Sequence, residues 1–344
     1  MKTSIIAVCA FTLAMFSAGC SLMGKTPGPG KGEYWRALHL LNYNNDAALD
    51  GLAAKLPELA SNGINVLVLE IDYHYEFKSH PELRMRNPIT FDGARRFAAA
   101  CRKNDIRLIP QFQCLGHQSW DKDTFTLLTV YPELDLTPGA YPGNEGLYCR
   151  EWDVTNPRVY EIVFPLLDEI IEAFQADALH VGMDEVFLLG SDLSPATRGK
   201  DPAVLFAECV NDLYGHIVKT RGIEMLMWAD RLIDGSVHTF GKWESSMNGT
   251  APAIDMVPKD IIMCPWHYNK RETYTSIPML LDKGFRVLPA SWHDVEAARM
   301  LIGYSAGLNN PNMLGHFFTT WGRAGEDVAS YPPVVELAGM LKKR

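Results

Sequence analysis

The chain has 344 residues, of which 47% are hydrophobic and 21% are charged, a balance typical of a folded globular protein and not of a disordered one. Its 32 Lys and Arg against 41 Asp and Glu give a formal net charge of −9, which argues against a nucleic-acid-binding surface. The length allows about two domains of ordinary size, or one larger α/β barrel.

Residues 1–19 have the pattern of an export signal. A basic residue at position 2, an apolar run and three small residues precede Cys20. The apolar run is shorter than the ~20 residues that cross a bilayer, so an uncleaved anchor is the weaker alternative. The segment ending at Cys20 resembles a bacterial lipoprotein signal, which implies a lipid on that thiol. We therefore expect an exported lipoprotein of the bacterial cell envelope, with residues 20–32 as a tether and residues 33–344 as the folded part.

The cysteines beyond the signal are Cys101, Cys114, Cys149, Cys209 and Cys264. Their odd number leaves at least one thiol free, although Cys114 and Cys149 could bridge across one long loop. No pair has the C-x-x-C or Cys/His spacing of a zinc site. The sequence therefore predicts neither a metal nor a cofactor.

Short β-rich runs alternate with helical patterns from residue 35 onward. We predict strands at 35–41, 65–72, 107–113, 178–184, 223–229, 261–266, 285–291 and 313–320. We predict helices at 46–61, 92–104, 156–174, 202–220, 274–283, 295–302 and 333–342. Eight strand–helix units in series favour an α/β fold with a parallel sheet. Eight is also the number of such units in a TIM barrel, so we predict a single (β/α)8 barrel. An open doubly wound sheet is the alternative, but no glycine-rich nucleotide loop follows any strand.

Two connections are longer than ordinary loops, residues 114–155 after the third strand and residues 230–260 after the fifth. Both leave the carboxyl ends of strands, where barrel enzymes build their sites. Polar and aromatic residues gather at these ends: Asp72, His117, Asp184, Glu185, Trp228, Asp230, Trp266, Trp292, His293, Asp294, Trp321 and Arg323. Tryptophans after each of the last four strands suit the walls of a sugar site, because sugar C–H faces stack on indole rings, although core packing is the other explanation.

Residues 179–185 carry the sharpest local pattern, L-H-V-G-M-D-E. Alternation along a strand sends His180, Gly182 and Asp184 toward the barrel axis and the residues between them toward the helices. Two neighbouring carboxylates repel, so one of Asp184 and Glu185 titrates high and can donate a proton. Capping of the next segment is the alternative role for this pair, and its position at a strand end makes it a site candidate.

Residues 180–186 resemble the H-x-G-G-D-E motif of glycoside hydrolase family 20, the β-N-acetylhexosaminidases. Residues 106–117 are similar to that family's P-E-x-D-x-P-G-H segment, and residues 80–83 to the end of its F-P-E-L. The resemblance covers roughly residues 33–325. It implies an exo-acting hydrolase that removes terminal β-linked N-acetylhexosamine from a carbohydrate substrate.

The resemblance also implies a retaining mechanism in which the 2-acetamido oxygen of the substrate attacks C1 and forms an oxazoline. Asp184 would orient and polarise the acetamide N–H, and Glu185 would protonate the leaving oxygen and later activate water. His117, with Asp72, would tune Glu185. The residues implied in sugar binding are Arg36, His117, His180, Trp228, Asp230, Trp266, Trp292, His293, Asp294, Trp321 and Arg323.

The sequence departs from the family pattern at five positions near the site, the first of which is Met183 in place of the second glycine of the motif. Gln111 and Gln113 stand in the segment where the family has acidic residues, and His293 stands where it has a tyrosine that contacts the acetamide oxygen. Arg323 replaces a carboxylate that holds the distal hydroxyls. A cation there suits a sulfated or acidic sugar, unless Arg323 points away or pairs with Glu326.

Two other functions stay open at this stage. One is a retaining glycosidase that acts on a non-acetylated sugar, with Glu185 as the acid and Asp294 or Asp230 as the nucleophile. The other is a glycan-binding lipoprotein without turnover, for which His293 and Arg323 are the reasons. The sequence does not predict an oligomeric state.

Overall fold

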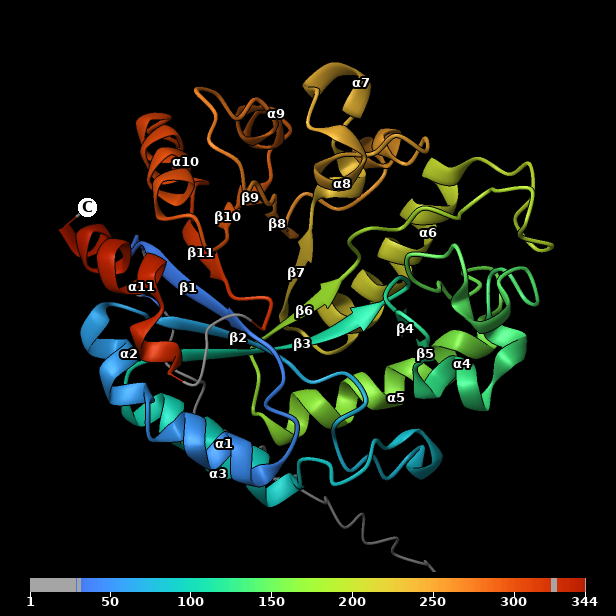
Figure 1. Cartoon of the computed structure of the whole chain (residues 1–344), viewed down its shortest axis with the longest axis horizontal. Helices are drawn as coiled ribbons and strands as arrows, with labels where there is room; N and C mark the ends of the chain where they lie inside the picture. Colours follow the sequence, from blue (N-terminus) through green and yellow to red (C-terminus); the bar gives the residue numbers. More distant parts are fainter. Residues whose placement is uncertain (1–28, 30–31, 323–326, 344) are drawn as a thin grey trace, which may run out of the picture.

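The computed structural model describes Pro29, residues 32–322 and residues 327–343. A parallel sheet lies at the centre of this part of the chain, and helices surround it (Figure 1). The strands follow one another in the order β10-β11-β1-β2-β3-β6-β7-β8-β9. They are β1 (Trp35–Leu40), β2 (Val66–Glu70), β3 (Arg107–Cys114), β6 (Ala178–Gly182), β7 (Glu224–Trp228), β8 (Ile262–Cys264), β9 (Arg286–Val287), β10 (Ala290–Ser291) and β11 (Gly315–Thr319). The loop after β3 adds a small antiparallel pair, β4 (Ser119–Trp120) and β5 (Asp123–Thr124).

The main helices follow these strands along the chain. They are α1 (Asp46–Ala53), α2 (Leu56–Asn62), α3 (Phe91–Lys103), α5 (Pro157–Ala173), α6 (Pro202–Tyr214), α9 (Ser276–Asp282), α10 (Val295–Gly307) and α11 (Pro332–Leu337). Three short helices, α4 (Thr126–Val130), α7 (Gly235–His238) and α8 (Gly241–Glu244), lie in the two long loops. N-cap side chains accept hydrogen bonds from free N–H groups at the start of the longer helices, as Thr90 does for α3 and Asp294 for α10.

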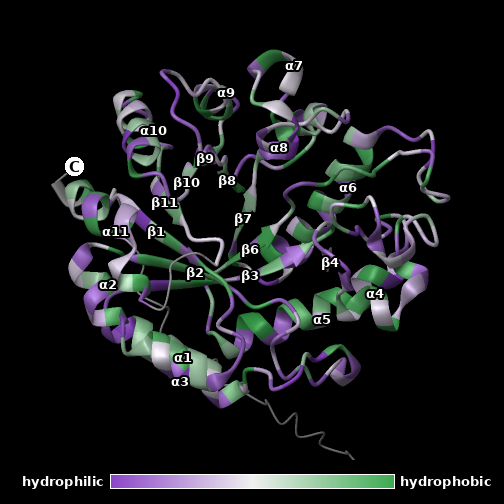
Figure 2. Cartoon of the chain, viewed as in Figure 1, coloured by the Kyte–Doolittle hydropathy of each residue, from purple (hydrophilic) through white to green (hydrophobic). Residues whose placement is uncertain are grey.

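The core has two layers, one inside the curled sheet and one between the sheet and the helices. Inside the sheet lie Trp35, Ala37, Val68, Leu226 and Phe317, from four strands. The outer layer takes the alternate residues of the same strands together with the inner faces of the helices. Figure 2 shows the strongly apolar β2 inside the ring of helices, whose outer faces are more polar.

The α/β class and the curled parallel sheet are as predicted. The predicted helix 46–61 is two helices, because Pro57 has no N–H to bond the carbonyl of Ala53 and the first helix ends there. The predicted strand 285–291 is interrupted by Leu288 and Pro289, which divide it into β9 and β10.

The bridge that the sequence allowed between Cys114 and Cys149 is not formed: both thiols are free, as are the other three cysteines of the described part. None of the described helices is long and apolar enough to cross a membrane. The predicted export signal, Cys20 and Arg323 lie outside the described residues.

Candidate active site

Asp184 and Glu185 follow β6 in a tight turn at the carboxyl end of the sheet. Gly182, Met183 and Glu185 have φ values of 67°, 74° and 53°, so the chain turns sharply through left-handed backbone at the strand end. A Cβ at Gly182 would meet Oε1 of Gln113 at 1.5 Å, so only glycine fits beside that side chain. Gln113 in turn donates from Nε2 to Oδ1 of Asp184 at 3.0 Å.

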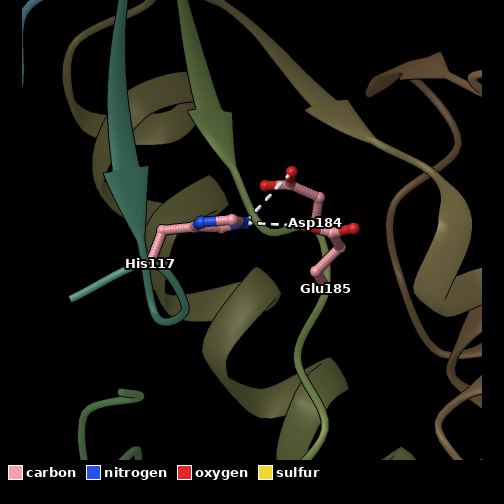
Figure 3. A group of neighbouring side chains, drawn as sticks. All are labelled: His117, Asp184 and Glu185. Atoms are coloured by element: carbon pink, nitrogen blue, oxygen red, sulfur yellow. Dashed lines mark ion pairs between the residues drawn. The ribbon is translucent and has the colours of Figure 1, made fainter. Parts of the chain in front are cut away.

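His117 joins the two carboxylates from the loop after β3 (Figure 3). Its Nε2 lies 3.2 Å from Oε2 of Glu185 and 3.4 Å from Oδ2 of Asp184. Burial opposes a charge on the ring, but the negative charge of Asp184 and the contacts with both carboxylates raise the pKa of His117 well above its ordinary value. Burial also opposes the charge of Asp184, and the nearby imidazolium lowers the pKa of that carboxyl. The site therefore holds a cation between two acids at neutral pH.

Tyr148 is a member of this group that sequence reasoning missed. Its hydroxyl donates to Oε2 of Glu185, and its ring lies 5.8 Å from the ring of His117. Tyr148 lies toward the end of the long loop after β3, 31 residues after His117, and no local pattern in that loop marks it as a site residue.

Asp230 holds in place the backbone of the turn at residues 182–185, which we call the catalytic turn. Its Oδ2 accepts the N–H of Glu185 at 2.9 Å and Nε of Arg231 at 2.7 Å, and its Oδ1 accepts Nε1 of Trp266 at 3.2 Å. Burial raises the pKa of Asp230 to about 6, although Arg231 opposes the shift. Both carboxylate oxygens are thus engaged by the protein, which fits a positioning role better than a nucleophilic one.

Three of the predicted tryptophans gather around Tyr268, a residue that sequence reasoning also missed. Trp266 stacks on Tyr268 with ring centres 5.0 Å apart, and Trp292 lies 5.5 Å from it. Nε1 of Trp321 donates to the hydroxyl of Tyr268 at 2.7 Å. The fourth, Trp228, is fully buried inside the sheet and stacks on Phe317. The aromatic group around Tyr268 therefore forms one wall beside the carboxylates, and Trp228 lies beneath it.

Four predicted site residues lie elsewhere or act differently. Arg36 is at the amino end of β1, where its guanidinium bonds Glu33 and two backbone carbonyls, so its predicted place in the sugar site is wrong. His180 is buried inside the sheet, 4.7 Å from Trp228, and burial lowers its pKa to about 3. His293 is exposed. Asp294 caps α10 with the N–H groups of residues 296 and 297 and faces Lys270 at the surface.

Two further carboxylates lie near Asp184 at the end of β2. Glu70 accepts Nε2 of Gln111 at 2.9 Å, and Asp72 accepts the backbone N–H of Gln113 at 2.7 Å. Burial raises the pKa of Asp72 to about 6, although the charge of His117 opposes the shift. The side chains of the two glutamines that depart from the family pattern thus donate to acids, Gln111 to Glu70 and Gln113 to Asp184.

His117, Asp184 and Glu185 are also a candidate group of metal ligands. His117, Asp184 and Glu185 each offer a ligand atom within 4.8 Å of the others, the one such group in the described part of the chain. Gln113 and Tyr148 already donate to one oxygen of each carboxylate. Donors directed at the carboxylates suit proton transfer better than cation binding, so we assign the group to acid–base chemistry.

Glu151 fixes the segment that follows the catalytic turn, and this makes it a source of pH-dependent stability. Its Oε1 accepts the N–H groups of Phe187 and Leu188 at 2.6 and 2.9 Å. Burial raises the pKa of Glu151 from an ordinary value of 4.5 to about 7, with the two N–H groups opposing the shift. Between these pH values the unfolded chain has lost the proton and the folded chain keeps it, so stability falls as the pH rises from 4.5 to about 7.

We expect Glu151→Gln to remove this loss, because glutamine can keep the acceptor oxygen and does not ionise. The variant should gain up to ~3 kcal/mol over wild type at pH 8 and little at pH 4. Denaturant unfolding at both pH values measures the difference, and Glu133→Gln, at a half-exposed side chain, is the control. An equal effect of Glu151→Gln at pH 4 and pH 8 would contradict this account.

Comparisons with known proteins agree on one family. The family model described as "Glycosyl hydrolase family 20, catalytic domain" matches residues 59–295. A β-hexosaminidase of Emericella nidulans is 25% identical over 281 residues, which cover 75% of this chain and 43% of that protein. β-Hexosaminidase 1 of Coccidioides posadasii is 22% identical over 284 residues, with 74% and 43% covered. The chain thus spans less than half the length of these relatives.

Solved structures share the fold at low sequence identity. The chitobiase of Flavobacterium johnsoniae superimposes with a TM-score of 0.62 at 18% identity, over 90% of this chain and 47% of that one. Dispersin B superimposes with a TM-score of 0.57 at 15% identity, over 90% of this chain and 99% of that one. The family match spans more than half of the chain and includes the turn that carries the two carboxylates. The chain therefore belongs to glycosyl hydrolase family 20.

Proposed function

We propose that the chain is an exo-acting, retaining glycoside hydrolase that removes terminal β-linked N-acetylhexosamine, with the substrate's own acetamide as the nucleophile. The observation that carries this proposal is the arrangement of Asp184, Glu185 and His117. The two carboxylates are adjacent and share one imidazolium, while Asp230 and Asp294 are both engaged in holding the backbone. This set suits one acid–base group and one group that manages the acetamide.

In the first step, Asp184 accepts the acetamide N–H and turns the acetamide oxygen toward C1. That oxygen forms a bond to C1 as the bond from C1 to the leaving oxygen breaks, and Glu185 gives its proton to the leaving oxygen. The carboxylate of Asp184 stabilises the positive charge that develops on the oxazoline ring. In the second step, Glu185 takes a proton from water, and the water oxygen forms a bond to C1 as the bond from C1 to the acetamide oxygen breaks. The acetamide is thereby restored, and the sugar leaves with its configuration retained.

His117 supports both steps from beside the carboxylates. Its cation stabilises Glu185 once the proton has been transferred and keeps Asp184 ionised, as the low pKa of Asp184 requires. The aromatic group around Tyr268 would receive the apolar faces of the bound sugar and its acetamide methyl.

We also propose that the sheet closes into a barrel. Only Leu288 and Pro289 separate β9 from β10, and β9 pairs with β8 while β10 pairs with β11. If β9 and β10 are counted as one interrupted strand, eight strands form a closed (β/α)8 barrel with long loops after its third and fifth strands. Export and the lipid on Cys20 stay predictions from the sequence.

The proposal is tested with a panel of β-glycosides that differ at the 2-position. Substrates with a 2-acetamido group, of the gluco and galacto series, should be hydrolysed, and the matching 2-hydroxy glycosides should not. Comparable rates on the 2-hydroxy glycosides would favour the two-carboxylate alternative. Binding of N-acetylated sugars without any hydrolysis would favour a glycan-binding protein instead.

A further inference from the structure

A second aromatic group surrounds Tyr148, the residue whose hydroxyl donates to Glu185. Tyr148 contacts Trp120, Trp243 and Phe187, with ring centres 5.8, 4.8 and 6.0 Å apart. Trp120 also lies parallel to His117, with their ring centres 6.3 Å apart. We call Trp120, Tyr148, Phe187 and Trp243 the outer aromatic group, and none of them was predicted from the sequence.

The two aromatic groups follow different, neighbouring sets of strands in the sheet. The outer aromatic group comes from the loops that follow β3, β6 and β7, whereas the group around Tyr268 follows β8, β10 and β11. Figure 1 shows β4 and α8, which carry Trp120 and Trp243, on the side away from β10 and β11. Asp184 and Glu185 follow β6, the middle strand of the set that carries the outer aromatic group.

The exposure of the outer aromatic group distinguishes it from core packing. Trp120 is 56% exposed and Trp243 is 40% exposed, and they are the exposed tryptophans of the described residues. Tyr148 connects them to the acid, because its ring touches both indoles and its hydroxyl donates to Glu185. Two large apolar side chains thus face solvent, and both contact Tyr148. Tyr148 in turn bonds Glu185, the group that would protonate the leaving oxygen.

We propose that Trp120 and Trp243 form the subsite for the sugar ring on the leaving-group side of the scissile bond. This inference rests on the proposed function. The leaving oxygen must lie within hydrogen-bonding distance of Glu185, so the ring attached to it passes over the side chains beside Glu185. A pyranose presents C–H groups on its faces, which stack on exposed indoles. The occupant is therefore a second sugar ring, and the preferred substrate is an oligosaccharide.

The test compares a β-linked N-acetylhexosamine disaccharide with the methyl glycoside of the same terminal sugar, which has no second ring. Trp243→Ala should lower kcat/KM for the disaccharide by about tenfold, through KM, and affect the methyl glycoside by a much smaller factor. Trp120→Ala should do the same. Trp120→Phe keeps a ring beside His117, so it separates loss of stacking from disturbance of that imidazole. Val335→Ala, at a 50% exposed position on α11, is the matched surface control.

Each outcome decides between the subsite and its alternatives. Equal losses on both substrates, or no loss on either, would overturn the subsite while leaving the proposed function intact. A change in sedimentation without a change in the substrate ratio would assign the exposed indoles to self-association and also overturn it. If the wild type hydrolyses neither substrate, the proposed function itself fails.

Discussion

Glu185→Gln is expected to lower kcat/KM for N-acetylated glycosides by ~10²- to 10⁴-fold, which is the usual contribution of a general acid–base group. An amide of the same shape can still accept from Tyr148, but it can neither give a proton to the leaving oxygen nor take one from water. The loss should be smaller for aryl glycosides whose leaving oxygen is stable as an anion, because their first step needs little protonation. Initial rates over a series of aryl leaving groups measure this effect.

The fold of the Glu185→Gln variant provides the control. The side chain is only about one-seventh exposed, but its neighbours are polar and the volume does not change, so the melting temperature should stay close to that of the wild type. A folded variant that hydrolyses N-acetylated substrates at a near-wild-type rate would remove Glu185 from the acid–base role.

Asp184→Asn is expected to have the second large effect, ~10²- to 10³-fold in kcat, because a neutral amide stabilises the developing oxazolinium charge poorly. The wild-type carboxyl has a pKa below its ordinary value of 3.8, so it is ionised throughout the neutral range and the loss should not diminish as the pH rises. The variant also loses one half of the ion pair with His117. Measurement of kcat and KM from pH 5 to pH 8 separates the loss of turnover from a loss of binding.

Substrate preference gives the decisive control for Asp184. If this carboxylate manages the acetamide, then Asp184→Asn should reduce hydrolysis of 2-acetamido glycosides far more than any residual hydrolysis of 2-hydroxy glycosides. An equal reduction of both would assign Asp184 to general electrostatics and would contradict the assisted mechanism.

The parts of the site that the sequence revealed are those fixed by short-range pattern. Strand periodicity acts over only a few residues, so the alternation of residues 179–185 was enough to place Asp184 at the strand end. The resemblance of the same segment to the family motif identified Glu185. The same reasoning failed for Arg36. Its neighbours Trp35 and Ala37 point into the sheet, so Arg36 points outward, and it lies at the amino end of its strand.

The parts that the sequence did not reveal depend on long loops. Tyr148 and Trp243 lie in loops whose sequences show no regular alternation of apolar and polar residues. Tyr148 contacts Glu185, 37 residues away in the chain, and Trp243, 95 residues away, so packing between distant segments sets their positions. Tyr268 was missed beside Trp266 because a single aromatic residue after a strand does not show which indoles will surround it. Only the folded arrangement brings these side chains together.

The free cysteines have a practical consequence for following the protein's unfolding. All five thiols of the described part are at most 2% exposed, and burial raises the pKa of Cys149 and Cys209 to about 12. Both properties suppress reaction with thiol reagents in the native protein. Since no disulfide joins these residues, reductant should leave the melting temperature unchanged, and thiol labelling should begin only as the chain opens. The rate of cysteine labelling therefore measures unfolding without an added probe. Labelling of Cys149, which lies beside the catalytic turn, measures the opening of the active site itself.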